Sequence, residues 1–311
     1  MNKIENPIIL LNGISRSGKA VTWYLVGNIQ GIDAPQNNPF SDWIIDAYKS
    51  KEIKKEGITT LLYEFFRLNS WFSYIGRNLN LKEIDQSAFL KFNTKNELKK
   101  RDILPDDSKS WIQFSKDWRD SKFIPCFTSG LDSEVQMLLE QHDINFININ
   151  TIRSPKRVFL EWCRTKRCAR FDSLDKMGVF YFNYKDFNVP GFAYDYREKW
   201  IESSDVERSF LVIEDYYRTF FDQDQNKKIN LIFEDMVQEP LGSLKKLSNF
   251  FELPIKEDFM ERLNLMNVPR IIDIDSYYKD EDGFLEKIDA SSLEKLEKLE
   301  KEFNSFRSEN S

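Results

Sequence analysis

The stretch PIILLNGISRSGKAVTWYLVGNI, residues 7–29, decides the fold. Residues 7–12 are continuously apolar up to a final Asn, as expected for a short strand that is buried on both faces of a parallel sheet. Residues 13–17 are small and polar and predict a turn, and the apolar spacing of residues 18–29 predicts a helix. The sequence therefore predicts a strand, a tight turn and a helix in direct succession.

The turn carries an anion-binding motif. Residues 13–19, GISRSGK, match the pattern G-x-x-x-x-G-K between a strand and a helix, which is the context that the motif needs. The two glycines allow successive N–H groups to point at one anion, the helix N-terminus adds partial positive charge, and Arg16 and Lys19 add full charges. The next residue is Ala20, where nucleotide hydrolases and kinases place a Ser or Thr that holds magnesium. We therefore expect a phosphate cradle without the usual metal ligand; a plain strand-to-helix turn with two incidental cations is the alternative.

Further apolar runs predict strands at 123–128, 144–152 and 229–233, with helices at 132–141, from Ser154 and Pro155 onward, and at 241–251. This alternation predicts an α/β fold, a three-layer sandwich with a central parallel sheet, in one domain over residues 1–311. Residues 43–118 are mostly helical without a repeat, and we expect a helical insertion that caps the acceptor side. The tail, residues 291–306, is an amphipathic helix expected to pack back on the domain through Leu293, Leu296, Leu299 and Phe303.

Composition excludes several function classes. The chain has 311 residues, 41% of them hydrophobic, and its 45 basic and 51 acidic side chains give a net charge of −6. This balance argues against general binding to nucleic acid or anionic membranes. Three Cys and one His exclude most metal chemistry, and so few thiols fit a reducing compartment. No apolar run reaches the length of a signal-peptide core or a membrane span, so we expect a cytoplasmic protein.

A second anion site is predicted where Ile152-Arg153-Ser154-Pro155 ends a strand and opens a helix. Ligands of open parallel sheets bind at the carboxyl ends of the strands, which places Arg153 on the same rim as residues 13–19. Two anion sites on one rim suggest a nucleotide with phosphates at both ends. The basic residues from Arg164 to Arg170 are interpreted as a solvated helix face, and Asp235 as the cap of a following helical turn.

Three blocks in order together resemble the sulfotransferases that use 3′-phosphoadenosine 5′-phosphosulfate (PAPS). They are LLNGISRSG at 10–18, INTIRSPKRVFLEW at 149–162 and INLIFEDMVQEPLGSLKKLSNFFELP at 229–254. The first is similar to the family's 5′-phosphosulfate loop, the second to its 3′-phosphate segment, and the third to its Glu-Asp, Pro and leucine-patterned helix segment. The resemblance covers roughly residues 7–30 and 120–290. It implies a P-loop NTPase-like fold, PAPS as co-substrate, no metal requirement and sulfuryl transfer to a hydroxyl of a sugar or small-molecule acceptor.

The resemblance also implies site residues. The catalytic positions are Arg16, Lys19 and, as the general base, Asp42; the donor-binding positions are Gly13, Ile14, Ser15, Arg16, Ser17, Gly18, Lys19, Ala20, Arg153 and Lys279. Three departures stand out. Lys19-Ala20 replaces the Thr-Thr pair of many members, Glu161 stands where a Ser contacts the 3′-phosphate, and the segment around Lys279 lacks the Arg-Lys-Gly pattern.

The general base and the function class stay open at this point. Asp132, Glu134, Glu64 and His142 are the other candidates for the base, His142 being expected at the opposite rim. A kinase or nucleotide hydrolase that uses ATP with Lys19 and Asp235 is one alternative function, and a non-catalytic protein that binds a phosphorylated ligand is another. The expected partner is a small-molecule or glycan acceptor, with no nucleic acid and no membrane span, and a homo-oligomer is allowed.

Overall fold

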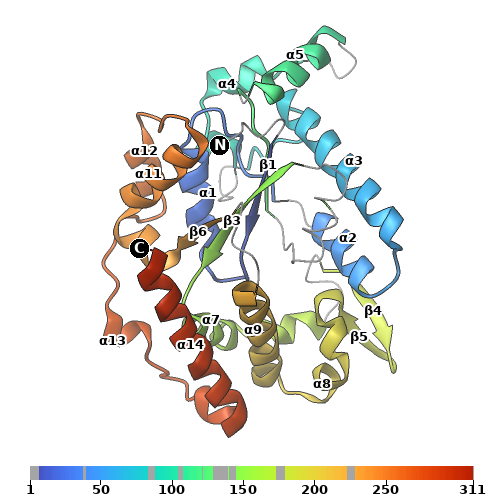
Figure 1. The fold of residues 1–311 in the computed structure, drawn as a ribbon, viewed down its shortest axis with the longest axis vertical. Helices are drawn as coiled ribbons and strands as arrows, with labels where there is room; N and C mark the ends of the chain where they lie inside the picture. Colours follow the sequence, from blue (N-terminus) through green and yellow to red (C-terminus); the bar gives the residue numbers. More distant parts are fainter. Residues whose placement is uncertain are drawn as a thin grey trace.

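The computed structural model describes residues 7–37, 40–82, 88–103, 108–120, 122–128, 139, 145–172, 179–222 and 228–310. Its centre is a parallel sheet in the order β2-β1-β3-β6 (Figure 1). The strands are β1 (Ile8–Asn12), β2 (Cys126–Thr128), β3 (Phe146–Ile152) and β6 (Lys228–Ile232). In the register, Leu10 lies beside Phe127 on one side and Asn148 on the other. The predicted parallel sheet is confirmed, with β2 shorter than the apolar run that predicts it.

Both faces of the sheet are covered, because successive side chains of β1 point to opposite sides. Ile9 and Leu11 pack in one cluster, to which one set of helices contributes most of the helical side chains, and Ile8 and Leu10 pack in another, with a second set. The first set is α1 (Lys19–Gly27), α10 (Phe233–Gln238) and α11 (Pro240–Phe251), and the second is α2 (Phe40–Lys49) and α3 (Lys55–Tyr74). The predicted three-layer α/β sandwich is therefore confirmed.

A further apolar cluster lies at the carboxyl end of the sheet and includes Ile152 and Ile232 from the ends of β3 and β6. It is formed mainly by α7 (Pro155–Arg164), α9 (Asp205–Asp222) and the C-terminal helix α14 (Ala290–Asn310), which run together in the lower half of Figure 1. Leu296, Leu299 and Phe303 are buried there. The prediction that the C-terminal helix packs back on the domain is confirmed.

The region 43–118 is mostly helical where it is described. Besides α2 and α3 it contains the 3₁₀ helix η1 (Phe89–Lys91), α4 (Lys95–Lys100) and α5 (Ser108–Arg119). The α5 helix packs on α3 through an aromatic cluster that includes Trp71 and Phe114. Because α2 and α3 lie on a face of the sheet, they form one layer of the sandwich. That this region also caps the acceptor stays a prediction.

Several elements have no counterpart in the predicted pattern. They are the hairpin β4 (Tyr181–Tyr184) and β5 (Phe187–Pro190), the helices α8 (Arg197–Glu202), α9, α12 (Phe259–Asn264) and α13 (Ile274–Tyr277), and the 3₁₀ helices η2 (Cys168–Asp172), η3 (Gly191–Tyr196) and η4 (Leu285–Lys287). The hairpin turns at Lys185 and Asp186, both with positive φ, so the usual Gly signal of such a turn is missing. The predicted helix at 132–141 lies outside the described residues, apart from Leu139. None of the described helices combines the length and the apolar character that a membrane crossing needs.

Candidate functional site

The loop between β1 and α1 is held in a conformation that requires its two glycines. Gly13 and Gly18 have φ of 150° and 105°, and Arg16 between them has a φ of 73°. A Cβ on Gly18 would collide with the Phe233 ring, and a Cβ on Gly13 would lie 2.9 Å from the carbonyl oxygen of Thr151. Residues 13–18 are therefore wedged against the end of β3 and the start of α10, and the predicted strand, turn and helix are confirmed.

Neighbouring elements anchor the loop through its backbone. The Trp162 Nε1–H of α7 donates to the Ser15 carbonyl at 2.7 Å, and Arg153 Nη1 donates to the Arg16 carbonyl at 2.9 Å. The backbone of Ile14 hydrogen-bonds the Tyr216 hydroxyl of α9. Arg16 and Arg153, which the sequence places on one rim, are thus in direct contact.

Inside the loop, Ser17 is fully buried and its Oγ has no hydrogen-bond partner within the part of the chain that the structure describes. A buried hydroxyl without a partner costs free energy, so such a group in a native structure points to a missing acceptor or donor. Thr22 is different, because its Oγ1 lies 2.7 Å from Thr151 Oγ1 and ties α1 to β3. Ala20 lies in the first turn of α1. Ser17 is therefore suited to meet a ligand oxygen, whereas Thr22 is structural.

Arg16 and Lys19 belong to this loop, Arg167 lies within electrostatic reach of both, and Arg170 lies within reach of Arg167; we call these four side chains the loop cation group. Burial lowers the pKa of Lys19, Asp42 raises it and Arg167 lowers it further. Burial also lowers the pKa of Arg167, and the charges of Arg170 and Arg16 add to that effect. Across the described ranges, none of the four forms a salt bridge shorter than 4 Å. Among the described residues, the group therefore carries an excess of positive charge, and one carboxylate raises the pKa of Lys19.

That carboxylate, Asp42, is half-buried in the first turn of α2. The structure thus brings the predicted base within electrostatic reach of Lys19, and its role stays a prediction. Glu64 is exposed and pairs with Arg67 at 2.7 Å. The remaining candidates for the base, Asp132, Glu134 and His142, lie outside the described residues.

The second predicted anion residue, Arg153, is engaged by protein groups. Its guanidinium lies 4.2 Å from the Phe233 ring centroid and 5.1 Å from that of Tyr277. Its Nε donates to the Tyr277 hydroxyl at 2.6 Å, and that hydroxyl donates to Glu234 Oε1 at 2.7 Å. Glu234 is buried, and burial raises its pKa. Arg153, Tyr277 and Glu234 therefore form a continuous hydrogen-bonded chain.

The beginning of α7 is also occupied by the protein's own carboxylates. Glu300 of α14 accepts from Ser154 Oγ at 2.8 Å and from the Lys156 backbone N–H at 3.1 Å. Glu161 pairs with Arg157 at 2.5 Å and with Arg164 at 3.3 Å. A helix N-terminus attracts anions, and here Glu300 takes that place. We call Arg153, Ser154, Arg157, Glu161, Glu234, Tyr277 and Glu300 the Arg153 cluster.

Some sequence interpretations need correction, and some residues were missed. Arg167 is half-buried beside the loop and is not part of a solvated helix face. Asp235 is not a cap, because Ile232 is the N-cap of α10 and Asp235 pairs with Arg307 at 2.6 Å. Lys279 is exposed and pairs with Glu281 at 3.3 Å. The sequence analysis missed Glu300 because the surrounding residues look like an ordinary charged helix. It also missed Tyr277, since only the lysine of the block YYKDEDG was considered as a site residue.

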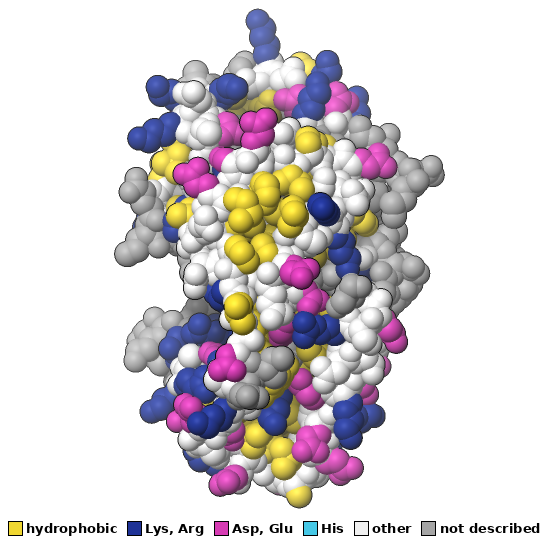
Figure 2. All heavy atoms as spheres, turned by 90° about the vertical axis from the view of Figure 1, so that its left-hand side faces the viewer, with side chains coloured by type: hydrophobic (Ala, Val, Ile, Leu, Met, Phe, Trp, Pro, Cys, Tyr) yellow, Lys and Arg dark blue, Asp and Glu magenta, His cyan; other side chains and the backbone are white. Residues whose placement is uncertain are grey.

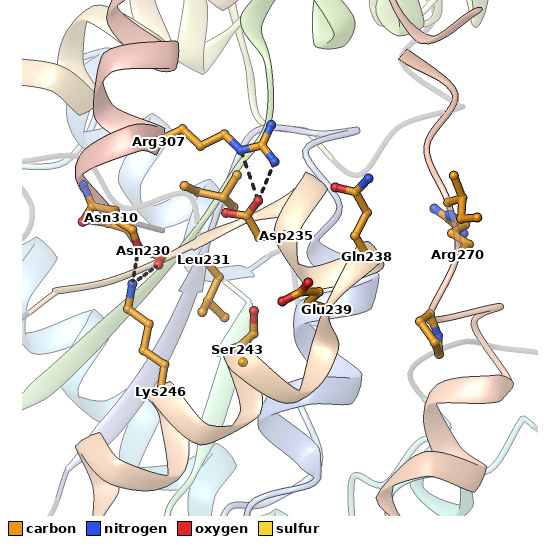
Figure 3. Close-up of a pocket in the computed structure, with 14 residues that line it drawn as sticks. Asn230, Leu231, Asp235, Gln238, Glu239, Ser243, Lys246, Arg270, Arg307 and Asn310 are labelled. Atoms are coloured by element: carbon orange, nitrogen blue, oxygen red, sulfur yellow. Dashed lines mark hydrogen bonds and ion pairs between the residues drawn. The ribbon is translucent and has the colours of Figure 1, made fainter.

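A separate cavity of about 800 Å³ lies along the edge strand β6, between α10, α11, residues 269–271 and the end of α14. Figure 3 shows Arg307 bound to Asp235 and Lys246 reaching the carbonyl oxygens of Asn230 and Asn310. An apolar area lies on the α11–α12 side of the molecule (Figure 2), where the exposed apolar side chains are Leu241, Met260, Leu265 and Ile271. None of the residues predicted to bind the donor lines this cavity, so it is distinct from the loop site.

Comparisons with known proteins give structural likeness only. No family model matches the chain, and no curated protein sequence matches it. The chain is similar to the sulfotransferase domain of the Synechococcus PCC 7002 olefin synthase, with 13% identity, a TM-score of 0.44, and 97% and 96% of the two chains covered. It is similar to the sulfotransferase domain of the curacin biosynthetic pathway, with 10% identity, a TM-score of 0.46, and 96% and 98% covered. It is also similar to the sulfotransferase STF9 from Mycobacterium avium, with 12% identity, a TM-score of 0.38, and 93% of this chain and 78% of that chain covered.

Proposed function

We propose that this chain is a sulfotransferase that moves a sulfuryl group from PAPS to a hydroxyl of a sugar or small-molecule acceptor. The observation that carries the proposal is the loop at residues 13–19, where, within the described residues, basic side chains lie together, the buried Ser17 hydroxyl has no hydrogen-bond partner and Asp42 lies within electrostatic reach of Lys19. The three sequence blocks that resemble the family support it, since residues from all three, Ser15, Trp162 and Phe233 among them, pack around the loop.

The residues fit the two ends of the donor unequally. At the 5′ end, the Ser17 hydroxyl, Arg16 and Lys19 offer donors and charge for an anionic group. At the 3′ end, Arg153 and Lys279 would hold the phosphate, but Arg153 also donates to Tyr277 and to the loop. The proposal therefore assigns most of the donor's binding free energy to residues 13–19.

The bound donor supplies an activated sulfuryl group whose transfer leaves negative charge on a phosphate. Arg16 and Lys19 stabilise that charge, with the positive end of α1 beside them. Asp42 takes the proton from the acceptor hydroxyl, as a carboxylate within reach of the loop can do. Ala20 offers no oxygen to a metal, so the proposed reaction proceeds without magnesium.

A thermal-shift screen tests the donor. We expect 3′-phosphoadenosine 5′-phosphate (PAP) to raise the melting temperature, ATP to raise it less, and magnesium to add little. Because Arg16 is exposed, Arg16→Ala should leave the unliganded melting temperature unchanged and abolish the response to PAP. A magnesium-dependent response to ATP that exceeds the PAP response would instead support a kinase or hydrolase.

Incubation with labelled PAPS and a panel of sugar and small-molecule hydroxyl acceptors tests the reaction. Transfer of label to any acceptor, lost in Asp42→Asn and Arg16→Ala, is the expected result. PAP binding without transfer to any acceptor of the panel would identify a non-catalytic binding protein. The feature that would favour that outcome is the Arg153 cluster, in which protein groups already engage Arg153 and Ser154.

A further inference from the structure

Arg167 lies three residues beyond the end of α7, a helix that is hydrogen-bonded to the loop. Trp162 donates to the Ser15 carbonyl, and the Arg167 backbone N–H donates to the Trp162 carbonyl at 2.9 Å. Between them, Lys166 has a φ of 48°, which turns the chain after α7. Two consecutive hydrogen bonds thus connect Arg167 to the loop, and tertiary contact fixes its place there.

The guanidinium of Arg167 is half-buried and incompletely paired. Its Nε is buried without a hydrogen-bond partner among the residues that the structure describes. Its ring neighbour is Phe171, 5.8 Å from the guanidinium carbon to the ring centroid. A guanidinium is always charged and presents five donors, so a buried donor without an acceptor is costly unless a ligand supplies one.

Two other arginines of this segment do form ion pairs with a carboxylate. Arg157 and Arg164 both reach Glu161, at 2.5 and 3.3 Å. Arg167 instead lies within electrostatic reach of Arg16 and Lys19, where like charges repel one another. The repulsion between these charges lowers the stability of the unliganded fold, and a bound anion would remove it. This combination is typical of a ligand-binding site.

We infer that Arg167 is a binding residue of the loop site and, with Arg16 and Lys19, holds the phosphosulfate end of the donor. This inference rests on the proposed function. The inference requires a ligand with a multiply charged oxyanion. It assigns the site to the 5′ end of the donor and not to an anionic acceptor.

The test compares Arg167→Gln with the control variant Arg164→Gln, which changes the last residue of α7. PAP affinity is measured by calorimetry, and the melting temperature is measured without ligand. We expect Arg167→Gln to weaken PAP binding about 10- to 100-fold while the unliganded melting temperature stays the same or rises. Arg164→Gln, which loses ion pairs with Glu161 and Asp282 away from the loop, should change PAP affinity by less than about twofold.

Wild-type affinity for PAP in Arg167→Gln would overturn the inference, and so would a fall in melting temperature that accounts for the lost binding. Arg167→Lys keeps the charge without the planar fork and should give an intermediate affinity. Weakened use of an acceptor at unchanged PAP affinity would assign Arg167 to the acceptor and also overturn the inference. If the wild type binds ATP and not PAP, the proposed function is wrong, and the same pair of variants measured with ATP still decides whether Arg167 binds the phosphates.

Discussion

The loop cation group and the Arg153 cluster both concentrate basic side chains at the carboxyl ends of neighbouring strands, but they differ in how the charge is balanced. At the loop, Lys19 and Arg167 lie near other cations, and among the described residues Asp42 is the carboxylate with a resolved effect, on Lys19. In the Arg153 cluster the protein supplies the anions itself, from Glu161, Glu234 and Glu300.

The difference separates a place prepared for a ligand from one that holds the fold together. A half-buried cation with protein partners contributes hydrogen bonds and packing, as Arg153 does between Phe233 and Tyr277. Unpaired cations near one another cost free energy and persist where binding requires them. The three predictions that follow test this contrast.

The largest effect is expected at the loop backbone. Gly18→Ala would force a Cβ into the Phe233 ring at a φ of 105°, and we expect a loss of about 3 kcal/mol or more in the free energy of unfolding, together with the PAP response. Gly242→Ala, in α11 with open space around the new methyl group, is the control and should be neutral or slightly stabilising. Denaturant unfolding measures both, and equal effects at the two positions would contradict the strained-loop description.

An intermediate effect is expected when a carboxylate of the Arg153 cluster is removed. Glu161→Ser frees Arg157 from its partner at 2.5 Å, so the preference for PAP over AMP, which lacks the 3′-phosphate, should rise about fivefold. Glu64→Ser, which breaks an exposed Glu–Arg pair on α3, is the control and should change neither affinity. Calorimetry with PAP and AMP gives the ratio of the two affinities. An unchanged ratio would mean that the 3′-phosphate does not bind near Arg157.

The smallest effect is a pH dependence of stability. Burial raises the pKa of Glu300 above its ordinary 4.5, so the folded state binds its proton more tightly than the unfolded state does. The resulting stabilisation is present below pH 4.5 and is lost as the pH rises through the raised pKa. Glu300→Gln should therefore gain stability relative to wild type over that rise, on the order of 1 kcal/mol.

Glu297→Gln, exposed on the same helix, is the matched control for this measurement and should run parallel to wild type. Unfolding midpoints in denaturant between pH 4 and 8 give the comparison. A constant difference between Glu300→Gln and wild type at all pH values would show that Glu300 titrates alike in both states.

Local pattern predicted the strand, turn and helix at residues 7–29 because continuous apolar runs, glycine spacing and helical periodicity are properties of neighbouring residues. The rule that ligands bind at strand ends also placed Arg153 beside the loop, and the structure confirms that contact. The hairpin at residues 181–190 could not be predicted in this way, since its turn contains no Gly and Lys185 has a positive φ that lysine rarely adopts.

The sequence by itself determined the strand, turn and helix at residues 7–29 and the cations that the loop carries, since each follows from residues close together in the chain. Only the tertiary structure decided which charges are paired. Arg164 and Arg167 look alike in the sequence, and Glu300 lies 144 residues from the Lys156 amide that it caps. The packing of α7 against the loop and α14 determines which charges are paired, because the energy of a charge depends on the groups that surround it in space.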